Sequence, residues 1–268
     1  MYTKKEIIEQ LDALGAPRGS IVLMHASMRA VGDVEGGAEG LLDTLIEYFT
    51  RDGGLFCVPT HTWDNLGRDV PTLDLTRGES NLGLLTEIAA RDKRGIRSEN
   101  PTHSMVVYGD RARAEKLIEG DKTARTPTAP ETAYGEIYRQ SGYILLVGVA
   151  QSRNTFLHTV DEILNIPNRM VATPTKTTVK LDTGAIIERD LCLFDEEYNP
   201  DISLRFTKYD TAFRYHRALT DGFIGDAPTM LCSATRMKDV VELIHSRSGG
   251  IDPLADEEPI PQAWYVKR

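Results

Sequence analysis

Hydrophobic and polar positions follow one another along the chain in blocks that predict strands and helices in turn. A short apolar run at residues 20–25 predicts a strand, and after a glycine-containing loop residues 38–49 show the period of an amphipathic helix. A D-G-G turn at residues 52–54 leads into a second apolar run at residues 55–59. The order strand, helix, strand is typical of a βαβ unit.

The rest of the chain continues this pattern with one change of period. Residues 175–194 alternate between polar and apolar positions around a turn at Asp182-Thr183-Gly184, which predicts a β-hairpin. We therefore expect an α/β fold, with a single three-layer α/β/α domain over residues 1–268 and a mixed central sheet. The hairpin and the acidic stretch at about residues 172–212 would be an insertion in its C-terminal half. Further strands are predicted at residues 105–108 and 143–149, and further helices around residues 82–91, 112–118, 134–139 and 237–245.

Composition narrows the class of protein. The chain has 41% apolar and 26% charged residues, which is ordinary for a soluble globular protein. No apolar run approaches the ~20 residues that span a bilayer, so no membrane association is expected. Thr3 and Glu6 fit a helix capping box better than a signal peptide, and the cytoplasm is the expected location. The net charge of −9 disfavours nucleic acid as a partner and favours a cationic small molecule.

The most informative candidate for chemistry follows the strand predicted at residues 143–149. A short polar turn leads into a helix that carries His158 and, one turn later, Asp161. An imidazole beside a carboxylate at the carboxyl end of a strand is a common way to build a general base. Asn154 or Ser152 is the expected cap, and both catalytic candidates fall on the polar face. An ordinary histidine on a solvated face fits the same spacing, so both interpretations stay open at this point.

The loop after the first predicted strand is a candidate anion site. Ser27, Arg29 and a pair of glycines at residues 36–37 precede a helix N-terminus, where backbone N–H groups and a guanidinium favour anions. The segment matches neither the dinucleotide-binding nor the P-loop pattern. A tight turn that needs glycine explains the same residues equally well.

Four ordered segments resemble the aminoglycoside 3-N-acetyltransferase family, whose members use acetyl-CoA. They are L-M-H-A-S-M-R-A-V-G-D-V-E-G-G-A-E from residue 23, G-G-L-F-C-V-P-T-H-T-W-D from residue 53, R-S-E-N-P-T-H-S-M-V-V-Y-G from residue 97, and G-Y-I-L-L-V-G-V-A-Q-S-R-N-T-F-L-H-T-V-D-E from residue 142. The family pattern has Glu where Asp161 stands and His where Asn100 stands. The shorter Asp side chain implies a different geometry beside His158.

The resemblance implies roles at the matching positions. His158 would be the general base, and Asp161 would orient it and stabilise its charge. Trp63 and Asp64 would begin the acceptor pocket. The CoA channel would be lined by Ser27, Met28, Arg29, Val31 and Gly32, with Thr102, His103 and Ser104 near the thioester. Carboxylates suited to a cationic acceptor are Glu162, Asp195, Glu196 and Asp201.

The reaction implied by the resemblance is acetyl transfer from acetyl-CoA to the 3-amino group of a 2-deoxystreptamine aminoglycoside, an antibiotic-resistance activity. A histidine with an ordinary pKa of ~6.5 is suited to take the amine proton at working pH. No cysteine is needed, so we expect direct transfer, with Ser104, Thr155 or backbone N–H groups as donors to the oxyanion.

Other interpretations remain open. They are a different amine acceptor, a CoA-binding protein that has lost catalysis and, more remotely, a metal-dependent hydrolase. His25, His61 and His103 lack the spacing of metal ligands, so no metal is expected, and His25 and His103 are expected to be hydrogen-bonded structural or CoA-adjacent residues. A homodimer is a further expectation.

Overall fold

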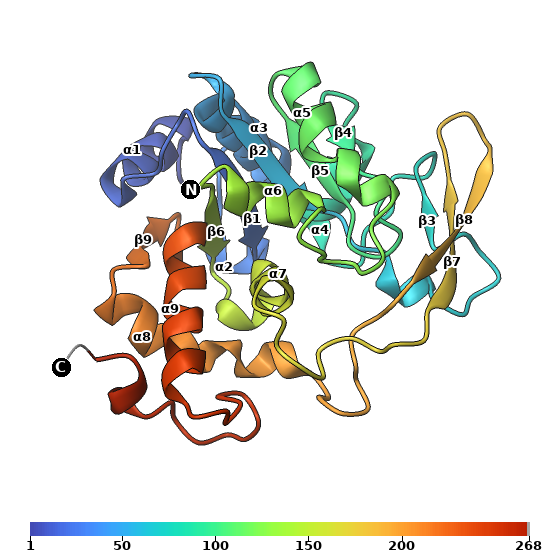
Figure 1. Ribbon diagram of the computed structural model, residues 1–268. Coiled ribbons are helices and arrows are strands. Elements are labelled where there is room, and N and C mark those ends of the chain that lie inside the picture. Colours follow the sequence, from blue (N-terminus) through green and yellow to red (C-terminus); the bar gives the residue numbers. More distant parts are fainter. Residues whose placement is uncertain (267–268) are drawn as a thin grey trace.

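The computed structural model describes residues 1–266 of the chain and has helices on both sides of a central sheet (Figure 1). No helix in this range is long and apolar enough to cross a membrane. The helices are α1 (Lys4–Leu14), α2 (Met28–Val31), α3 (Gly37–Thr50), α4 (Leu84–Arg91), α5 (Arg111–Leu117), α6 (Ala133–Arg139), α7 (Phe156–Ile163), α8 (Asp210–Tyr215) and α9 (Ala234–Arg247). The strands are β1 (Ile21–Ala26), β2 (Leu55–Pro59), β3 (Leu73–Asp74), β4 (Ile96–Arg97), β5 (Met105–Tyr108), β6 (Tyr143–Val147), β7 (Thr175–Lys180), β8 (Ile186–Leu191), β9 (Leu219–Ile224) and β10 (Ala227–Ser233).

Within the described residues, seven strands form one mixed sheet in the order β4-β5-β2-β1-β6-β10-β9. β1 pairs in parallel with β2 on one side and with β6 on the other, whereas the outer pairs are antiparallel. The three parallel strands end at Pro59, Ala26 and Val147, so the loops that follow them converge at one edge of the sheet. β5 starts at the same edge, because Met105 pairs with Pro59.

Both faces of the large sheet are apolar. Ile21 and Leu23 of β1 pack with residues of α5, α6, α7 and α9, while Val22 and Met24 pack with residues of α1, α3 and α4. This alternation follows from the two-residue period of a strand. All four side chains are at most 2% exposed, and burying each contributes about 1.5–3 kcal/mol. The predicted α/β/α layering with a mixed sheet is confirmed.

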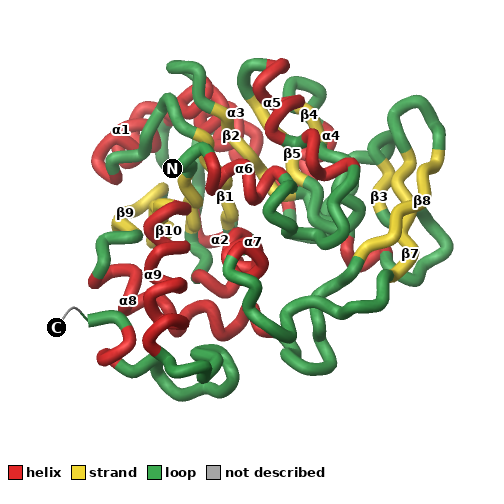
Figure 2. Tube along the Cα trace, viewed as in Figure 1, coloured by secondary structure: helices red, strands yellow, loops and turns green. Residues whose placement is uncertain are grey.

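The hairpin β7–β8 lies apart from the large sheet, where it forms a three-stranded sheet with β3 (Figure 2). Its turn is as predicted: the Leu181 amide donates to the Ala185 carbonyl at 2.8 Å, and Gly184 has a φ of 84°. β3 lies in the long connection between β2 and α4. It is fixed by contacts with residues 106 positions later, including an ion pair of 3.1 Å between Asp74 and Lys180.

The predicted bounds of helices and strands are most accurate where neighbouring residues alone determine the element. β2 and β5 have the predicted bounds, and the capping box of Thr3 and Glu6 is present at α1. The strands β9 and β10 are missing from the prediction. Gly222 and Pro228 interrupt their patterns, and β10 is held in place by its antiparallel pairing with β6.

Helix α7 is fixed to the C-terminal part of the chain by the buried Arg169. Its Nε donates to Asp161 at 2.8 Å, and its two terminal nitrogens donate to both carboxylate oxygens of Asp252 at 2.8 and 2.9 Å. The Arg169 carbonyl also accepts from the Asp195 amide at 3.0 Å. One residue therefore joins α7, the segment after the hairpin and the C-terminal segment.

Arg169→Ala would leave the buried Asp161 carboxylate without its partner. We expect the free energy of unfolding to fall by about 3–5 kcal/mol, measured by urea denaturation at pH 7. Arg111→Ala is the matched control, because its i,i+4 pair with Glu115 is exposed and should contribute less than ~1 kcal/mol. A loss for Arg169→Ala no greater than that of the control would contradict the assigned role.

Candidate active site

A cavity of about 1230 Å³ opens at the sheet edge where β1, β2 and β6 end. Ala26, Pro59 and Gly148 from these strand ends contribute to its lining, and the start of α4 and the segment from Leu193 to Ser203 complete its walls. The volume exceeds the ~300–1,000 Å³ typical of a pocket for one drug-sized ligand. The cavity can therefore hold two reactants together.

The turn after β6 is held tightly against the first β–α turn. The Ser27 amide donates to the Val147 carbonyl, and the Gly148 amide donates to the Pro228 carbonyl, each at 2.9 Å. Gly148 has a φ of 63°, and a Cβ there would lie 2.4 Å from the Cβ of Ala30. Glycine is required at this point, because no larger residue allows α2 to approach β6 so closely.

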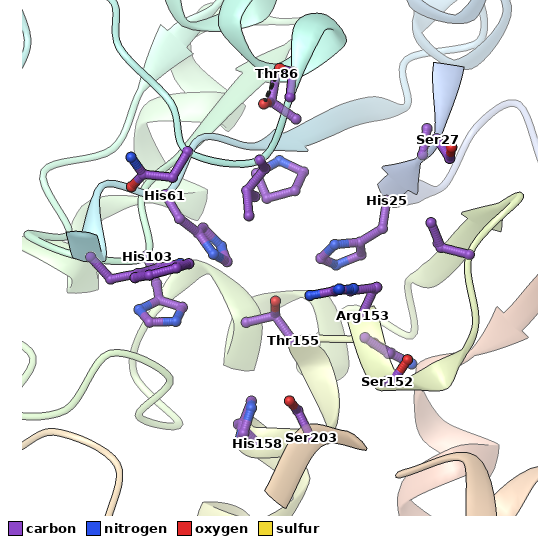
Figure 3. Close-up of a pocket in the computed structure, with 18 of the residues that line it drawn as sticks. His25, Ser27, His61, Thr86, His103, Ser152, Arg153, Thr155, His158 and Ser203 are labelled. Carbon is purple, nitrogen blue, oxygen red and sulfur yellow. Dashed lines mark hydrogen bonds between the residues drawn. The ribbon is translucent and has the colours of Figure 1, made fainter. Parts of the chain in front are cut away.

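Histidines from four separate segments line the cavity, and Figure 3 shows their rings around one space. They are His25 of β1, His61 after β2, His103 before β5 and His158 of α7. His61 Nε2 lies 2.9 Å from the Tyr134 hydroxyl, and His103 Nδ1 lies 2.9 Å from the Thr102 hydroxyl. The His61 and His103 ring centres are 4.3 Å apart. Within residues 1–266, no group of three or more His, Cys, Asp or Glu side chains is arranged to hold a metal ion.

Burial keeps these imidazoles neutral. It lowers the pKa of His25, His103 and His158 to about 3, and it lowers the pKa of His61 well below its ordinary value. The neighbouring rings of the other three histidines further oppose protonation of His61. At pH 7 each ring therefore has one N–H donor and one unprotonated nitrogen.

The His158 ring is held by aromatic contacts. Its centre lies 4.2 Å from that of Phe194 and 4.9 Å from that of Phe206. Asp161, predicted to orient this ring, instead pairs with Arg169 and is only 2% exposed. The predicted pair with His158 is thus wrong in this structure, because a buried guanidinium is the stronger partner for a buried carboxylate.

The prediction for the start of α7 also needs correction. Its N-cap residue is Thr155, whose side chain makes no capping hydrogen bond, so neither Asn154 nor Ser152 is the cap. The Asn154 side chain instead donates to Gln151 at 2.7 Å. Asp161 is buried, so the alternative of a solvated polar face does not hold at this position.

Ten of the predicted site residues meet at this cavity. They are Ser27, Met28, Arg29, Trp63, Thr102, His103, Thr155, His158, Glu196 and Asp201. Three positions predicted to contact CoA do not line it. Val31 belongs to the core beneath α2, Gly32 packs against Asp226, and Ser104 is fully buried, with its hydroxyl bonded to the Thr60 carbonyl at 2.7 Å. The glycine pair at residues 36–37 begins α3 away from the cavity, which favours the tight-turn interpretation.

Three predicted acceptor-binding acids also lie outside the lining, because each has a partner within the chain. Asp64 pairs with Arg68 at 3.1 Å. The Asp195 side chain accepts from the Tyr198 amide at 2.9 Å. Glu162 accepts hydrogen bonds from two hydroxyl groups, those of Thr126 and Thr128.

The charged side chains of the lining are of both signs. Arg29 and Arg153 follow the carboxyl ends of the neighbouring strands β1 and β6, and neither forms an ion pair among the described residues. Glu196 and Asp201 lie on the segment after the hairpin and are exposed. Arg153 and Phe194 are absent from the sequence prediction. Arg153 could have been found from its place in the turn after a predicted strand, whereas Phe194 has no local signal.

Comparisons with known proteins support the same family as the sequence motifs. The sequence profile of the aminoglycoside 3-N-acetyltransferase family matches residues 23–244. The SPbeta prophage-derived aminoglycoside N(3')-acetyltransferase-like protein YokD of Bacillus subtilis is 25% identical over 265 residues, covering 90% of this chain and 91% of YokD. Aminoglycoside N(3)-acetyltransferase IV of Salmonella is 26% identical over 253 residues, covering 94% of this chain and 89% of the relative.

Solved structures show the same fold. Aminoglycoside acetyltransferase AAC(3)-IVa, as a histidine-to-alanine mutant in complex with a gentamicin, has a TM-score of 0.77 at 24% identity, covering 95% of this chain and 90% of that chain. AAC-IIIb in its binary complex with CoASH has a TM-score of 0.77 at 22% identity, covering 94% of this chain and 99% of that chain. With the family profile matched over most of its length, the chain belongs to the aminoglycoside 3-N-acetyltransferase family of acyltransferases.

Proposed function

We propose that the protein transfers the acetyl group of acetyl-CoA directly to an amine of an aminoglycoside, with His158 as the general base. The observation that carries the proposal is the position of the His158 imidazole in the lining of a cavity large enough for two reactants. Family membership supports the reaction, the CoASH complex of AAC-IIIb supports the cosubstrate, and the gentamicin complex of AAC(3)-IVa supports the acceptor class.

The two guanidiniums of the lining fit the phosphates of acetyl-CoA. Arg29 and Arg153 are exposed and have no ion-pair partner in the described chain, although the protein carries a net charge of −9. Guanidinium groups bind phosphate through paired N–H donors. Acetyl-CoA supplies an activated thioester, and Ser27 and Met28 line the cavity next to Arg29.

His158 would act on the acceptor amine. An ammonium group has no free electron pair, so it must lose a proton before the nitrogen can attack. The unprotonated ring nitrogen of His158 takes this proton and later returns it to the departing thiolate, while the second proton that the nitrogen loses after its attack passes to solvent. Such assistance typically contributes ~10²–10⁴ in rate. Phe194 and Phe206 hold the ring in place and carry no group that could form a hydrogen bond with either nitrogen.

His158→Ala tests the proposed function. We expect kcat to fall by about 10²–10⁴, because the base is lost, while the affinity for CoA changes by less than about threefold. Thiol release from acetyl-CoA with a panel of aminoglycosides and simple amines measures the rate, and calorimetry measures CoA binding. His245→Ala is the control, since His245 on α9 does not line the cavity. CoA binding by the parent protein without thiol release from any amine would instead indicate a homologue that has lost catalysis.

The pH dependence is a separate prediction. Because burial lowers the pKa of His158 to about 3, its ring stays neutral down to pH 5. At saturating acetyl-CoA and acceptor, kcat should therefore vary by no more than about threefold between pH 5 and 7, because titration of the free acceptor amine does not enter kcat. A histidine with an ordinary pKa of ~6.5 would instead lose about tenfold in rate per pH unit below that value. Such a decline would show that the ring is hydrated in the working protein.

The carboxylates of the lining should bind the cationic acceptor. We expect the double change Glu196→Gln and Asp201→Asn to raise KM for an aminoglycoside about tenfold at low salt, and by less at high salt. Steady-state kinetics at two ionic strengths measures this. Glu197→Gln is the matched control, because Glu197 is adjacent and exposed but does not line the cavity. Equal KM values for the double variant and the control would remove these acids from the acceptor site.

A further inference from the structure

His25 has a buried ring nitrogen without a partner. The residue lies near the carboxyl end of the central strand β1 and is 6% exposed, and its Nε2 makes no hydrogen bond within residues 1–266. Nε2 therefore lacks the hydrogen bond expected of a structural histidine, and the alternative expectation, a residue adjacent to CoA, stays a prediction. An unpaired buried polar atom costs about 1–3 kcal/mol. This cost would be offset if a bound molecule supplied the partner.

The unpartnered nitrogen belongs to the lining of the cavity. Figure 3 shows the His25 ring directed into the same space as the side chains of Thr155 and His158, with Ser27 from the end of the same strand nearby. Burial lowers the pKa of His25 to about 3, so at neutral pH the ring can donate a hydrogen bond without being charged.

Acyl transfer needs such a donor. When an amine attacks a thioester, negative charge develops on the carbonyl oxygen, and preorganised N–H or O–H groups stabilise it. Of the two side-chain donors expected from the sequence, Ser104 is unsuitable, because its hydroxyl donates to the Thr60 carbonyl and lies outside the cavity. Thr155 does line the cavity. His25 is a further donor, from a different strand end.

We propose that Nε2–H of His25 donates a hydrogen bond to the carbonyl oxygen of the acetyl group during transfer. The inference rests on the proposed acetyl-transfer function and adds a second imidazole to it, with a role different from that of His158. The amine nitrogen, whose first proton His158 holds, forms the new C–N bond as the carbonyl electron pair moves to oxygen, and it then releases its second proton to solvent. As the C=O bond re-forms, the C–S bond breaks and the thiolate receives the proton held by His158. His25 keeps its own proton throughout.

His25→Leu separates this role from a structural one. It removes the donor but breaks no hydrogen bond of Nε2 within the described chain, so Tm should stay constant or rise. We expect kcat to fall about 10²–10³-fold, with KM for acetyl-CoA changed by less than about threefold. His25→Gln keeps an N–H donor and should recover about tenfold of the lost rate. His245→Leu, outside the cavity, is the control.

The outcomes distinguish this inference from the proposed function. A kcat for His25→Leu within about threefold of the parent, or a change confined to KM, would overturn the role of His25 but leave His158 as the base. If the parent protein released no thiol from acetyl-CoA with any amine of the panel, the proposed function itself would be overturned.

A crystal structure tests His25 even if both variants fail to fold. The unaltered protein would be crystallised with an acetyl-CoA analogue that has a methylene in place of the thioester sulfur. A separation of at most ~3.2 Å between Nε2 and the ketone oxygen supports the role, and a longer separation overturns it.

Discussion

Burial without a counter-charge is the constraint on which the proposed chemistry depends. The four cavity histidines come from segments far apart in the chain, yet each has a pKa held low by desolvation. A carboxylate bonded to any of these rings would favour the imidazolium form. Among residues 1–266 no carboxylate pairs with His158 or His25, which leaves two neutral rings that can act as proton acceptor and hydrogen-bond donor in the proposed reaction.

The absence of a carboxylate at His158 is explained by the way α7 is anchored. Asp161 is one turn from His158 along the helix, but the buried Arg169 engages it together with Asp252. The same residue holds the segment that carries Phe194 through the amide of Asp195. The ring of His158 is therefore oriented by aromatic packing. The ion pairs of Arg169 instead hold helix α7 against the C-terminal segment. Arg169 thus links the ion pairs that stabilise this region to the orientation of the His158 ring.

The sequence predicts the elements well where the signal is local. The apolar runs of β2 and β5 and the capping box at Thr3 give correct bounds, because adjacent residues determine them. The position of His158 on a helix that follows a strand is likewise visible from the order of apolar and polar blocks. The failures share one cause. The partner of Asp161, the closed hydroxyl of Ser104 and the pairing of β10 all depend on residues distant in the sequence. Side-chain type and spacing do not determine which partner is nearest after folding.

The positive and negative side chains of the cavity lie on different parts of the fold. The positive ones are proposed to bind the acetyl donor, and the negative ones are proposed to bind the amine. Arg29 and Arg153 follow central strands, whose positions are fixed by the packed core on both faces of the sheet. Glu196 and Asp201 lie on a connecting segment between the hairpin and α8, outside regular secondary structure. Connecting segments accept changes in sequence more readily than core strands do. The proposed site for the acetyl donor therefore follows the rigid part of the fold, whereas the acids proposed to select the amine lie where substitutions cost little stability. A fold arranged in this way can change its acceptor while it keeps the machinery of acetyl transfer.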